Sequence, residues 1–239
     1  MSLRDYEALS FDVYGTLIDW ESGMIAGLRP LTDRLGAEMR DDAVLEMHAR
    51  HESAAQSWTP GRRYADLLAT VYRRCAEELD LAVFWEECER YGASVPDWPA
   101  FPDSADALGY LAQHYRMFVL SNVDNRSFSG AARKLAIDWD GVFTAEDVGS
   151  YKPAQRNFDY LLAQTRASGI EDARLLHTAE SMFHDHVPAR ENGLDNAWIY
   201  RRHAKQGWGA TMDPGRPAET TFRFDSMAEM AAAHERGDV

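Results

Sequence analysis

Residues 8–19 read ALSFDVYGTLID, and this stretch decides how the rest of the chain is interpreted. A short, mostly apolar run, typical of a buried strand, ends on Asp12. Gly15 then permits a sharp turn, and Thr16 offers a hydroxyl back toward Asp12. Ligands of an open parallel α/β sheet bind beyond the carboxyl ends of its strands. Asp12 is therefore a candidate for chemistry.

Further short apolar runs follow, and helical patterns separate them. The runs predicted as strands are MFVLSN (117–122), GVFTAED (141–147), RLLHTAE (174–180) and NAWIY (196–200). The patterns predicted as crossover helices cover 128–136, 158–167 and 186–193. Residues 207–224 predict a loop that leads to an edge strand, and 226–236 a final helix. This alternation predicts the α/β class, with a doubly wound parallel sheet.

The interval after the first strand has a different pattern. Residues 20–99 show no convincing strand, but helical periodicity covers 44–58 and 64–81. Several prolines between 96 and 102 mark the return to the sheet. We therefore expect a core made of residues 1–18 and 100–239, with a helical insertion at 19–99.

Composition and charge limit the partners of the chain. The 239 residues include 25 Lys and Arg against 39 Asp and Glu, a formal net charge of −14. Such a charge opposes binding to nucleic acid or to anionic membranes, although a local basic pocket could still accept a small anionic substrate. There is no apolar run of membrane-spanning length, and we expect no signal peptide, since residues 1–7 are charged and lack an apolar segment. Cys75 and Cys88 show no metal or redox spacing, so we expect a cytoplasmic protein.

Polar residues follow the other predicted strands as well. Ser121 and Asn122 end the second strand, Lys152 precedes a proline after the third, and Glu180 and Asp185 follow the fourth. Because carboxyl ends of parallel strands share one edge of the sheet, we expect these side chains to converge on Asp12.

This set has a direct chemical interpretation. A carboxylate such as Asp12 can attack an electrophile to give an ester or an acyl phosphate, which water then cleaves. Lys152 would keep Asp12 ionised, while Thr16 and Ser121 would orient it. Asp185 could activate the water or hold a divalent cation, and the residues alone leave this open.

Four segments resemble the core motifs of the haloacid dehalogenase superfamily, in the same order. They are FDVYGTLID at Asp12, VLSN at Ser121, YKP at Lys152 and TAESMFHDHVPA from Glu180. The resemblance implies a hydrolase with a Rossmann-like core, and it implies that the helical insertion is the cap domain of that family. Phosphatases of this family carry a second acid two residues after the nucleophile, where this chain has Tyr14. With Tyr14 the motif is similar to the type II (L-2-haloacid) dehalogenase branch.

That resemblance implies roles for individual residues. Asp12 would displace halide from a short 2-haloacid to form an ester. Thr16, Ser121 and Lys152 would position Asp12, and Asp185 would activate water.

The substrate contacts implied in the same way lie at four other positions. Asn122 would help to hold the halide, and Tyr14 would line the pocket. Glu180 is expected to be a further substrate contact. The cap of this branch also supplies an arginine, for which the local alignment offers His48 or Arg50; Arg50 is preferred for its charge. The implied partner is a small anionic substrate, no cofactor is expected, and the resemblance allows a homodimer.

Two alternatives remain open. Glu180 and Asp185 have the spacing that magnesium-dependent phosphatases of the superfamily use, and a phosphonate-cleaving branch also lacks the second acid. If Mg²⁺ is used, its expected positions are Asp12, Tyr14 and Asp185. The other alternative is a non-catalytic module that binds a small ligand, which the complete set of reactive residues opposes.

Overall fold

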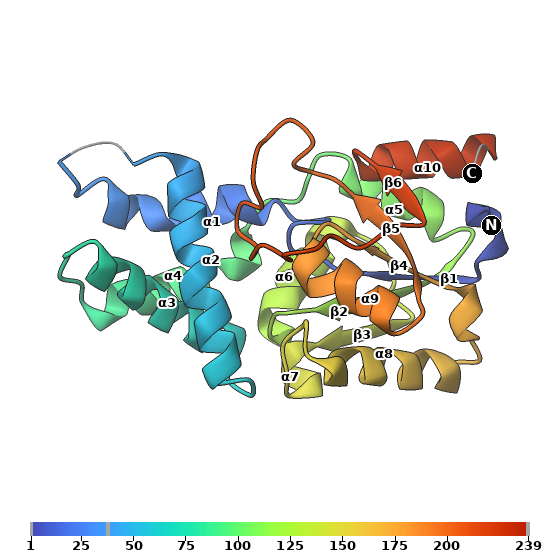
Figure 1. Cartoon of the computed structure of the whole chain (residues 1–239), viewed down its shortest axis with the longest axis horizontal. Coiled ribbons are helices and arrows are strands. Elements are labelled where there is room, and N and C mark those ends of the chain that lie inside the picture. Colours follow the sequence, from blue (N-terminus) through green and yellow to red (C-terminus); the bar gives the residue numbers. More distant parts are fainter. Residues whose placement is uncertain (1, 37–38, 238–239) are drawn as a thin grey trace.

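One parallel sheet forms the centre of the molecule, with strand order β3-β2-β1-β4-β5-β6 (Figure 1). The computed structural model describes residues 2–36 and 39–237. The strands are β1 (Ala8–Phe11), β2 (Arg116–Ser121), β3 (Gly141–Thr144), β4 (Leu175–Ala179), β5 (Asp195–Ile199) and β6 (Phe222–Phe224). The order reverses beside β1, so the sheet is doubly wound, and every strand predicted from the sequence is present.

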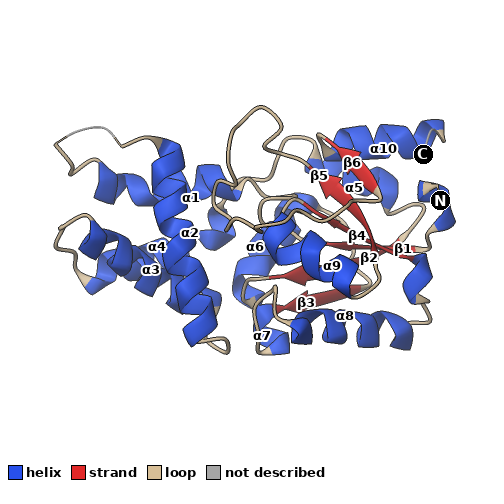
Figure 2. Ribbon diagram, in the orientation of Figure 1, coloured by secondary structure: helices blue, strands red, loops and turns tan. Residues whose placement is uncertain are grey.

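Helices cover both faces of this sheet (Figure 2). In the core they are α5 (Ser104–Leu111), α6 (Asn125–Leu135), α7 (Ala145–Val148), α8 (Gln155–Ala167), α9 (Val187–Glu191) and α10 (Met227–Arg236). Successive side chains of a strand point to opposite faces. On β2, Met117 and Val119 join the cluster that includes α5 and α10, whereas Phe118 and Leu120 join the cluster with α8. The apolar residues of β2 therefore pack into one hydrophobic cluster on each face of the sheet.

In the described part of the insertion between β1 and α5, the main elements are four α-helices. They are α1 (Trp20–Thr32), α2 (Asp41–Trp58), α3 (Tyr64–Glu78) and α4 (Trp85–Ala93), which we call the cap helices. Figure 1 shows them beside the sheet, apart from the core helices. The chain enters and leaves this part side by side, because Ile18 and Ala100 form an antiparallel bridge and the Asp19 amide donates to the Pro99 carbonyl over 2.8 Å. This pairing supports the division predicted near residues 18 and 100.

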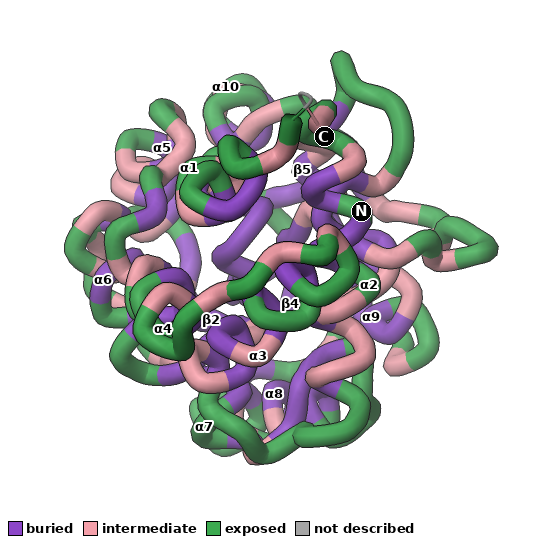
Figure 3. The backbone as a smooth tube through the Cα atoms, turned by 90° about the vertical axis from the view of Figure 1, so that its left-hand side faces the viewer, coloured by how far each residue is buried: buried purple, intermediate pink, exposed green. Residues whose placement is uncertain are grey.

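Burial follows the same architecture. In Figure 3 the strands run through the buried interior, while the outer turns of the cap helices are exposed. Cys75 and Cys88 are buried free thiols within the cap, as small apolar side chains would be. Within the described residues, the helices are too short or too polar to cross a membrane.

Candidate active site

Asp12 lies at the carboxyl end of β1 and is held by two donors. Thr16 Oγ1 donates to Asp12 Oδ2 over 2.7 Å, and Lys152 Nζ donates to Oδ1 over 2.9 Å. The turn between Asp12 and Thr16 depends on Gly15, whose φ is +103° and whose missing Cβ would lie 2.9 Å from Trp20 Nε1. The predicted contacts between these residues are therefore present.

The buried Lys152 ammonium is shared by two acids. It donates to Asp185 Oδ1 over 2.6 Å and to the Leu120 carbonyl over 2.9 Å, in addition to its bond to Asp12. Burial would lower the pKa of Lys152, but Asp12 and Asp185 outweigh it and the pKa is raised. Lys152 is therefore charged at neutral pH. With both acids ionised, the trio carries one excess negative charge.

The two acids respond to this charge differently. Burial is the largest influence on the pKa of Asp12 and raises it, with a further rise from Asp185, against the opposing pull of Lys152. Burial also acts to raise the pKa of Asp185, but Lys152 and a bond from His177 outweigh it, so this pKa is well below its usual range. Asp185 is thus the acid that remains ionised most strongly.

A buried histidine continues the network behind Asp185. His177 Nε2 lies 3.0 Å from Asp185 Oδ1, and His177 Nδ1 lies 2.9 Å from Ser10 Oγ. All three side chains are buried. His177 therefore links Ser10, on β1, to the Asp185 carboxylate.

A π-helical turn over Met182–His186 places Asp185 in the site. Such turns are rare and occur frequently at functional sites. Ser181 caps the turn by accepting from the His184 amide over 3.0 Å. His184 faces the site, whereas His186 Nε2 lies 2.9 Å from the Ala179 carbonyl. The two histidine side chains therefore point in different directions and do not form a shared metal site.

A small cavity of about 20 Å³ adjoins these groups. Its lining residues come from the strand ends and from the cap helices: Asp12, Tyr14, Trp20, Glu52, Gln56, Tyr64, Asn122, Val123, Lys152, Ser181, His184 and Asp185. This volume accommodates about one water molecule. A substrate must therefore enter by movement of the cap relative to the strand ends.

Tyr14 lines the cavity, but its hydroxyl points elsewhere. The hydroxyl donates to the Ser127 carbonyl over 2.9 Å, and the ring lies edge-on to Trp98. Burial, with a smaller contribution from Asp124, raises the pKa of Tyr14 well above its usual range. Tyr14 is therefore a neutral wall residue, and its proton is not available to a leaving group.

The prediction that Arg50 contacts the substrate is wrong for this structure. Its guanidinium lies on the surface, where it donates to Glu78 Oε1 over 2.6 Å. His48, the other option, is buried behind the cavity, with Nε2 2.7 Å from the Tyr91 hydroxyl. Arg50 points away because it lies on the opposite side of the helix from His48 and Glu52, which are one turn apart on the same face. The same helix, α2, instead presents Glu52 and Gln56 to the cavity.

Three further residues differ from their predicted roles. The Asn122 side chain lines the cavity, but its amide bonds to the backbone of Lys152, with Oδ1 accepting from the Lys152 amide over 2.6 Å and Nδ2 donating to its carbonyl over 3.0 Å. It therefore positions the lysine, and it has less capacity left for a halide. Ser121 Oγ is buried without a hydrogen-bond partner and does not reach Asp12.

Glu180 does not line the cavity, which contradicts its place among the substrate contacts. It contributes its backbone amide, which donates to Thr16 Oγ1 over 2.8 Å. Burial, followed by the nearby Glu21 and Asp12 carboxylates, raises the pKa of its side chain to about 8. Glu180 is therefore mostly protonated at neutral pH, and it adds little charge to the site.

The donor set for a divalent cation is small. Asp12 and Asp185 are two carboxylates, and Asp185 Oδ2 is a buried oxygen with no partner. However, the Lys152 ammonium lies between them, and the part of the chain that the structure describes has no group of three His, Cys, Asp or Glu side chains placed to hold a metal. Mg²⁺ commonly binds through one or two carboxylates, with water and substrate oxygens completing its shell. The two acids meet this minimum, and the ammonium between them is the feature that opposes a cation.

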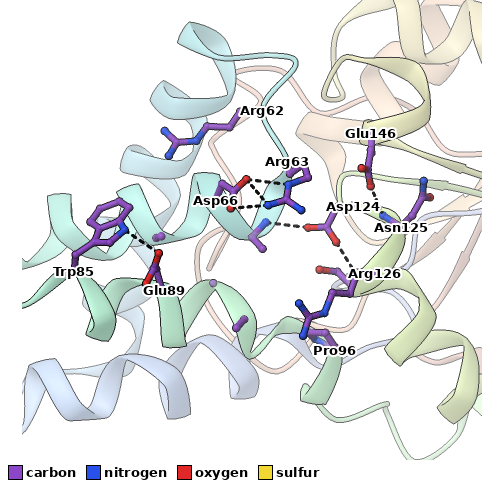
Figure 4. Close-up of a pocket in the computed structure, with 15 residues that line it drawn as sticks. Arg62, Arg63, Asp66, Trp85, Glu89, Pro96, Asp124, Asn125, Arg126 and Glu146 are labelled. Carbon is purple, nitrogen blue, oxygen red and sulfur yellow. Dashed lines mark hydrogen bonds and ion pairs between the residues drawn. The ribbon is translucent and has the colours of Figure 1, made fainter.

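A wider, open cavity of about 540 Å³ lies between α3, α4 and the start of α6 (Figure 4). Its charges are mixed, and the Arg63 guanidinium is already bound to Asp66. The feature of interest is Asp124. Its carboxylate accepts from the Ser127 amide of α6 over 2.8 Å and from the Ala65 amide of α3 over 2.9 Å. One core carboxylate therefore caps a core helix and a cap helix together.

The chain can now be compared with known proteins. The model of the haloacid dehalogenase-like hydrolases matches residues 6–174. The chain belongs to this family. The haloacid dehalogenase-like relative YfnB of Bacillus subtilis (strain 168) is 19% identical over 205 residues, with coverage of 82% of this chain and 85% of YfnB.

Solved structures of this family share the fold. The L-2-haloacid dehalogenase PA0810 superposes with a TM-score of 0.75 at 21% identity and covers 97% of this chain and 99% of its own. The L-2-haloacid dehalogenase of Xanthobacter autotrophicus has a TM-score of 0.75 and 15% sequence identity, with coverage of 96% of this chain and 98% of its own. YfnB of Bacillus subtilis bound to magnesium has a TM-score of 0.73 and 17% identity, with coverage of 98% of this chain and 99% of its own. The expected fold and family are thereby confirmed, and the chain is a haloacid dehalogenase-like hydrolase.

Three cap residues of the cavity in this hydrolase were not predicted: Glu52, Gln56 and Tyr64. They are distant in sequence from every strand end, so the rule that locates Asp12 and Lys152 does not apply to them. The signal that the sequence does carry is the pair of polar residues Glu52 and Gln56, one turn apart on the long cap helix. His184 lines the cavity as well and was also not predicted.

Proposed function

We propose that this hydrolase cleaves a carbon–halogen bond in short 2-halo carbonyl compounds through an ester on Asp12. The 2-haloacids are the class expected from the sequence. The observation that carries the proposal is the state of Tyr14. Tyr14 stands where the phosphatases of the family carry their second acid. Its hydroxyl donates to the Ser127 carbonyl, and its pKa is raised. The site is therefore suited to a leaving group that departs without a proton.

In the first step, an Asp12 oxygen attacks the carbon that bears the halogen. The new carbon–oxygen bond forms as the carbon–halogen bond breaks, and the halide leaves with the bonding electrons. Ester formation removes the negative charge of Asp12. Lys152 is then left with Asp185 as its single ionised partner at 2.6 Å, so the excess negative charge of the trio is relieved.

In the second step, water attacks the carbonyl carbon of the Asp12 ester. Asp185 is the group positioned to accept the proton, because its Oδ2 is buried and has no other partner. Lys152 stabilises the negative charge that develops on the carbonyl oxygen. Cleavage of the bond between that carbon and the product oxygen releases a 2-hydroxy product and regenerates Asp12.

Magnesium-dependent cleavage of a phosphomonoester is the second candidate. The unpartnered Asp185 Oδ2 favours it, since a cation would satisfy this oxygen. The neutral Tyr14 and the ammonium between the two acids oppose it. No step of the proposed reaction uses a metal.

Halide and phosphate release by the purified protein separates the two candidates. The substrates are 2-chloropropionate, 2-chloropropionamide, fluoroacetate and a panel of phosphomonoesters, each with and without EDTA. We expect halide release that persists in EDTA and is lost in Asp12→Asn. The Tyr14→Phe variant should release halide at the wild-type rate. Removal of a general acid would instead lower the rate by roughly 100-fold or more. Phosphate release that requires Mg²⁺ would overturn the proposal.

A further inference from the structure

The cap presents an acid, not a base, to the proposed reaction site. Glu52 is buried on α2 and lines the same cavity as Asp12 and Lys152. Arg50, two residues earlier on the helix, is bound to Glu78 on the surface. In the part of the chain that the structure describes, no arginine lines this cavity. A pocket that binds a carboxylate needs a positively charged group, whereas α2 contributes the acid Glu52 to this cavity.

Three side chains surround the Glu52 carboxylate. Gln56 Nε2 donates to Glu52 Oε1 over 3.0 Å, and His48 Nδ1 lies 3.4 Å from Oε2. Burial, and after it the Glu52 carboxylate, raises the pKa of Tyr64 at the start of α3. The hydrogen bond from Gln56 orients the carboxylate within the wall of the cavity.

The charges around the cavity can be counted. Among the described residues that line it, Asp12, Asp185 and Glu52 are acids and Lys152 is the one Lys or Arg. Both strand-end acids already bind Lys152. A substrate carboxylate would therefore face three acids and an ammonium that is already shared, and like charges repel strongly in a buried site. An N–H or O–H donor on the substrate would meet acceptors.

We propose that Glu52 makes this hydrolase select uncharged 2-halo compounds that carry a hydrogen-bond donor, such as 2-haloamides, over 2-haloacids. This inference rests on the proposed displacement of halide by Asp12. Gln56 belongs to the same selective wall, because its amide is held by Glu52 and faces the same cavity. The reaction remains balanced: a 2-haloamide and water give a 2-hydroxyamide, halide and a proton.

Kinetics with two matched substrates test the inference. The kcat/KM for halide release is measured with 2-chloropropionamide and with 2-chloropropionate, for the wild type and for Glu52→Gln. We expect the wild type to favour the amide by about tenfold or more, and Glu52→Gln to move the ratio toward the acid by a similar factor. Glu46→Gln is the matched control, since Glu46 is exposed on the same helix, and its ratio should equal that of the wild type.

A second variant keeps the test independent of the folding of the first. Gln56→Glu adds a carboxylate to the same wall and should shift the ratio further toward the amide. Equal or better use of the acid by the wild type would overturn the selectivity while leaving the Asp12 reaction intact. So would an unchanged ratio in the variants. Absence of halide release from both substrates would overturn the proposed function itself, and the selectivity with it.

Discussion

Lys152 donates to Asp185 Oδ1 over 2.6 Å, a shorter contact than its 2.9 Å bond to Asp12, the proposed nucleophile. The ammonium therefore belongs to both acids of the site. This sharing leaves one excess negative charge in the resting site when both are ionised, and the charge disappears when Asp12 becomes an ester. The arrangement links the electrostatics of the resting site to the proposed reaction.

Removal of the shared ammonium should destabilise the fold. Lys152→Met would leave Asp12 and Asp185 buried without a cation, which typically costs about 3–5 kcal/mol in the free energy of unfolding. Urea denaturation at pH 7 measures this. Arg73→Met is the control, because Arg73 is exposed and its pair with Glu77 lies on the surface. A Lys152→Met protein as stable as the wild type would contradict the ion-pair account.

His177 should act as a positioning residue through Asp185. His177→Phe removes the bond to Asp185 Oδ1, so we expect the water-activating step to slow by roughly 10- to 100-fold. Ester formation on Asp12 should be affected less, and the ester should accumulate.

Mass spectrometry of protein quenched during turnover would detect the added mass on Asp12. His186→Phe is the matched control, because this nearby buried histidine bonds to the Ala179 carbonyl and not to an acid. If His177→Phe slows halide release and ester hydrolysis equally, His177 has a structural role only.

Glu180 should make stability depend on pH. The folded side chain keeps its proton up to about pH 8, whereas a free glutamate loses it near 4.5. Between these values the unfolded state binds fewer protons, so stability falls as the pH rises, by up to about 1.4 kcal/mol per pH unit. In Glu180→Gln this contribution is absent. The free energy of unfolding of the variant should therefore rise relative to the wild type between pH 4.5 and 8 and then level off.

Urea denaturation at half-unit steps from pH 4.5 to 9 tests the Glu180 prediction. The difference between the two proteins isolates Glu180 from the other titrating groups. Two parallel curves would show that the folded Glu180 is ionised like a solvent-exposed acid.

Asp124 should stabilise the junction between core and cap twice over. It caps α6 through the Ser127 amide and α3 through the Ala65 amide, and α3 has no side-chain cap of its own. The loss of a helix cap typically costs about 1 kcal/mol, so Asp124→Ala should cost about twice as much as Ser226→Ala, which removes the single cap of α10. Denaturant unfolding measures both. Equal losses would show that the contact with α3 contributes nothing.

Much of the fold could be predicted from the sequence. The runs at 8–11, 117–121 and 175–179 are mostly apolar because both faces of these strands are buried, and this pattern indicates a parallel sheet. Asp12, Lys152 and Asp185 were found for the same reason. Each follows a strand, and the carboxyl ends of parallel strands meet at one edge.

The cap side of the site could not be predicted in the same way. Helix α2 carries His48, Arg50 and Glu52 within five residues, and local sequence does not decide which of them faces the core. That depends on how α2 rotates when its apolar positions pack against α1 and α3. The preference for Arg50 relied on charge, whereas packing turned Arg50 to the surface and Glu52 inward.

The sequence by itself therefore determined the sheet, its helical insertion and the reactive acids beside β1, because strand periodicity and chain order specify where strand ends lie. The tertiary structure alone decided which side chains complete the cavity. It made Asn122 a support for Lys152, bound the Tyr14 hydroxyl to Ser127 and placed Glu52 in the wall. These choices depend on the rotation and approach of separate elements, which are set by packing over the whole molecule.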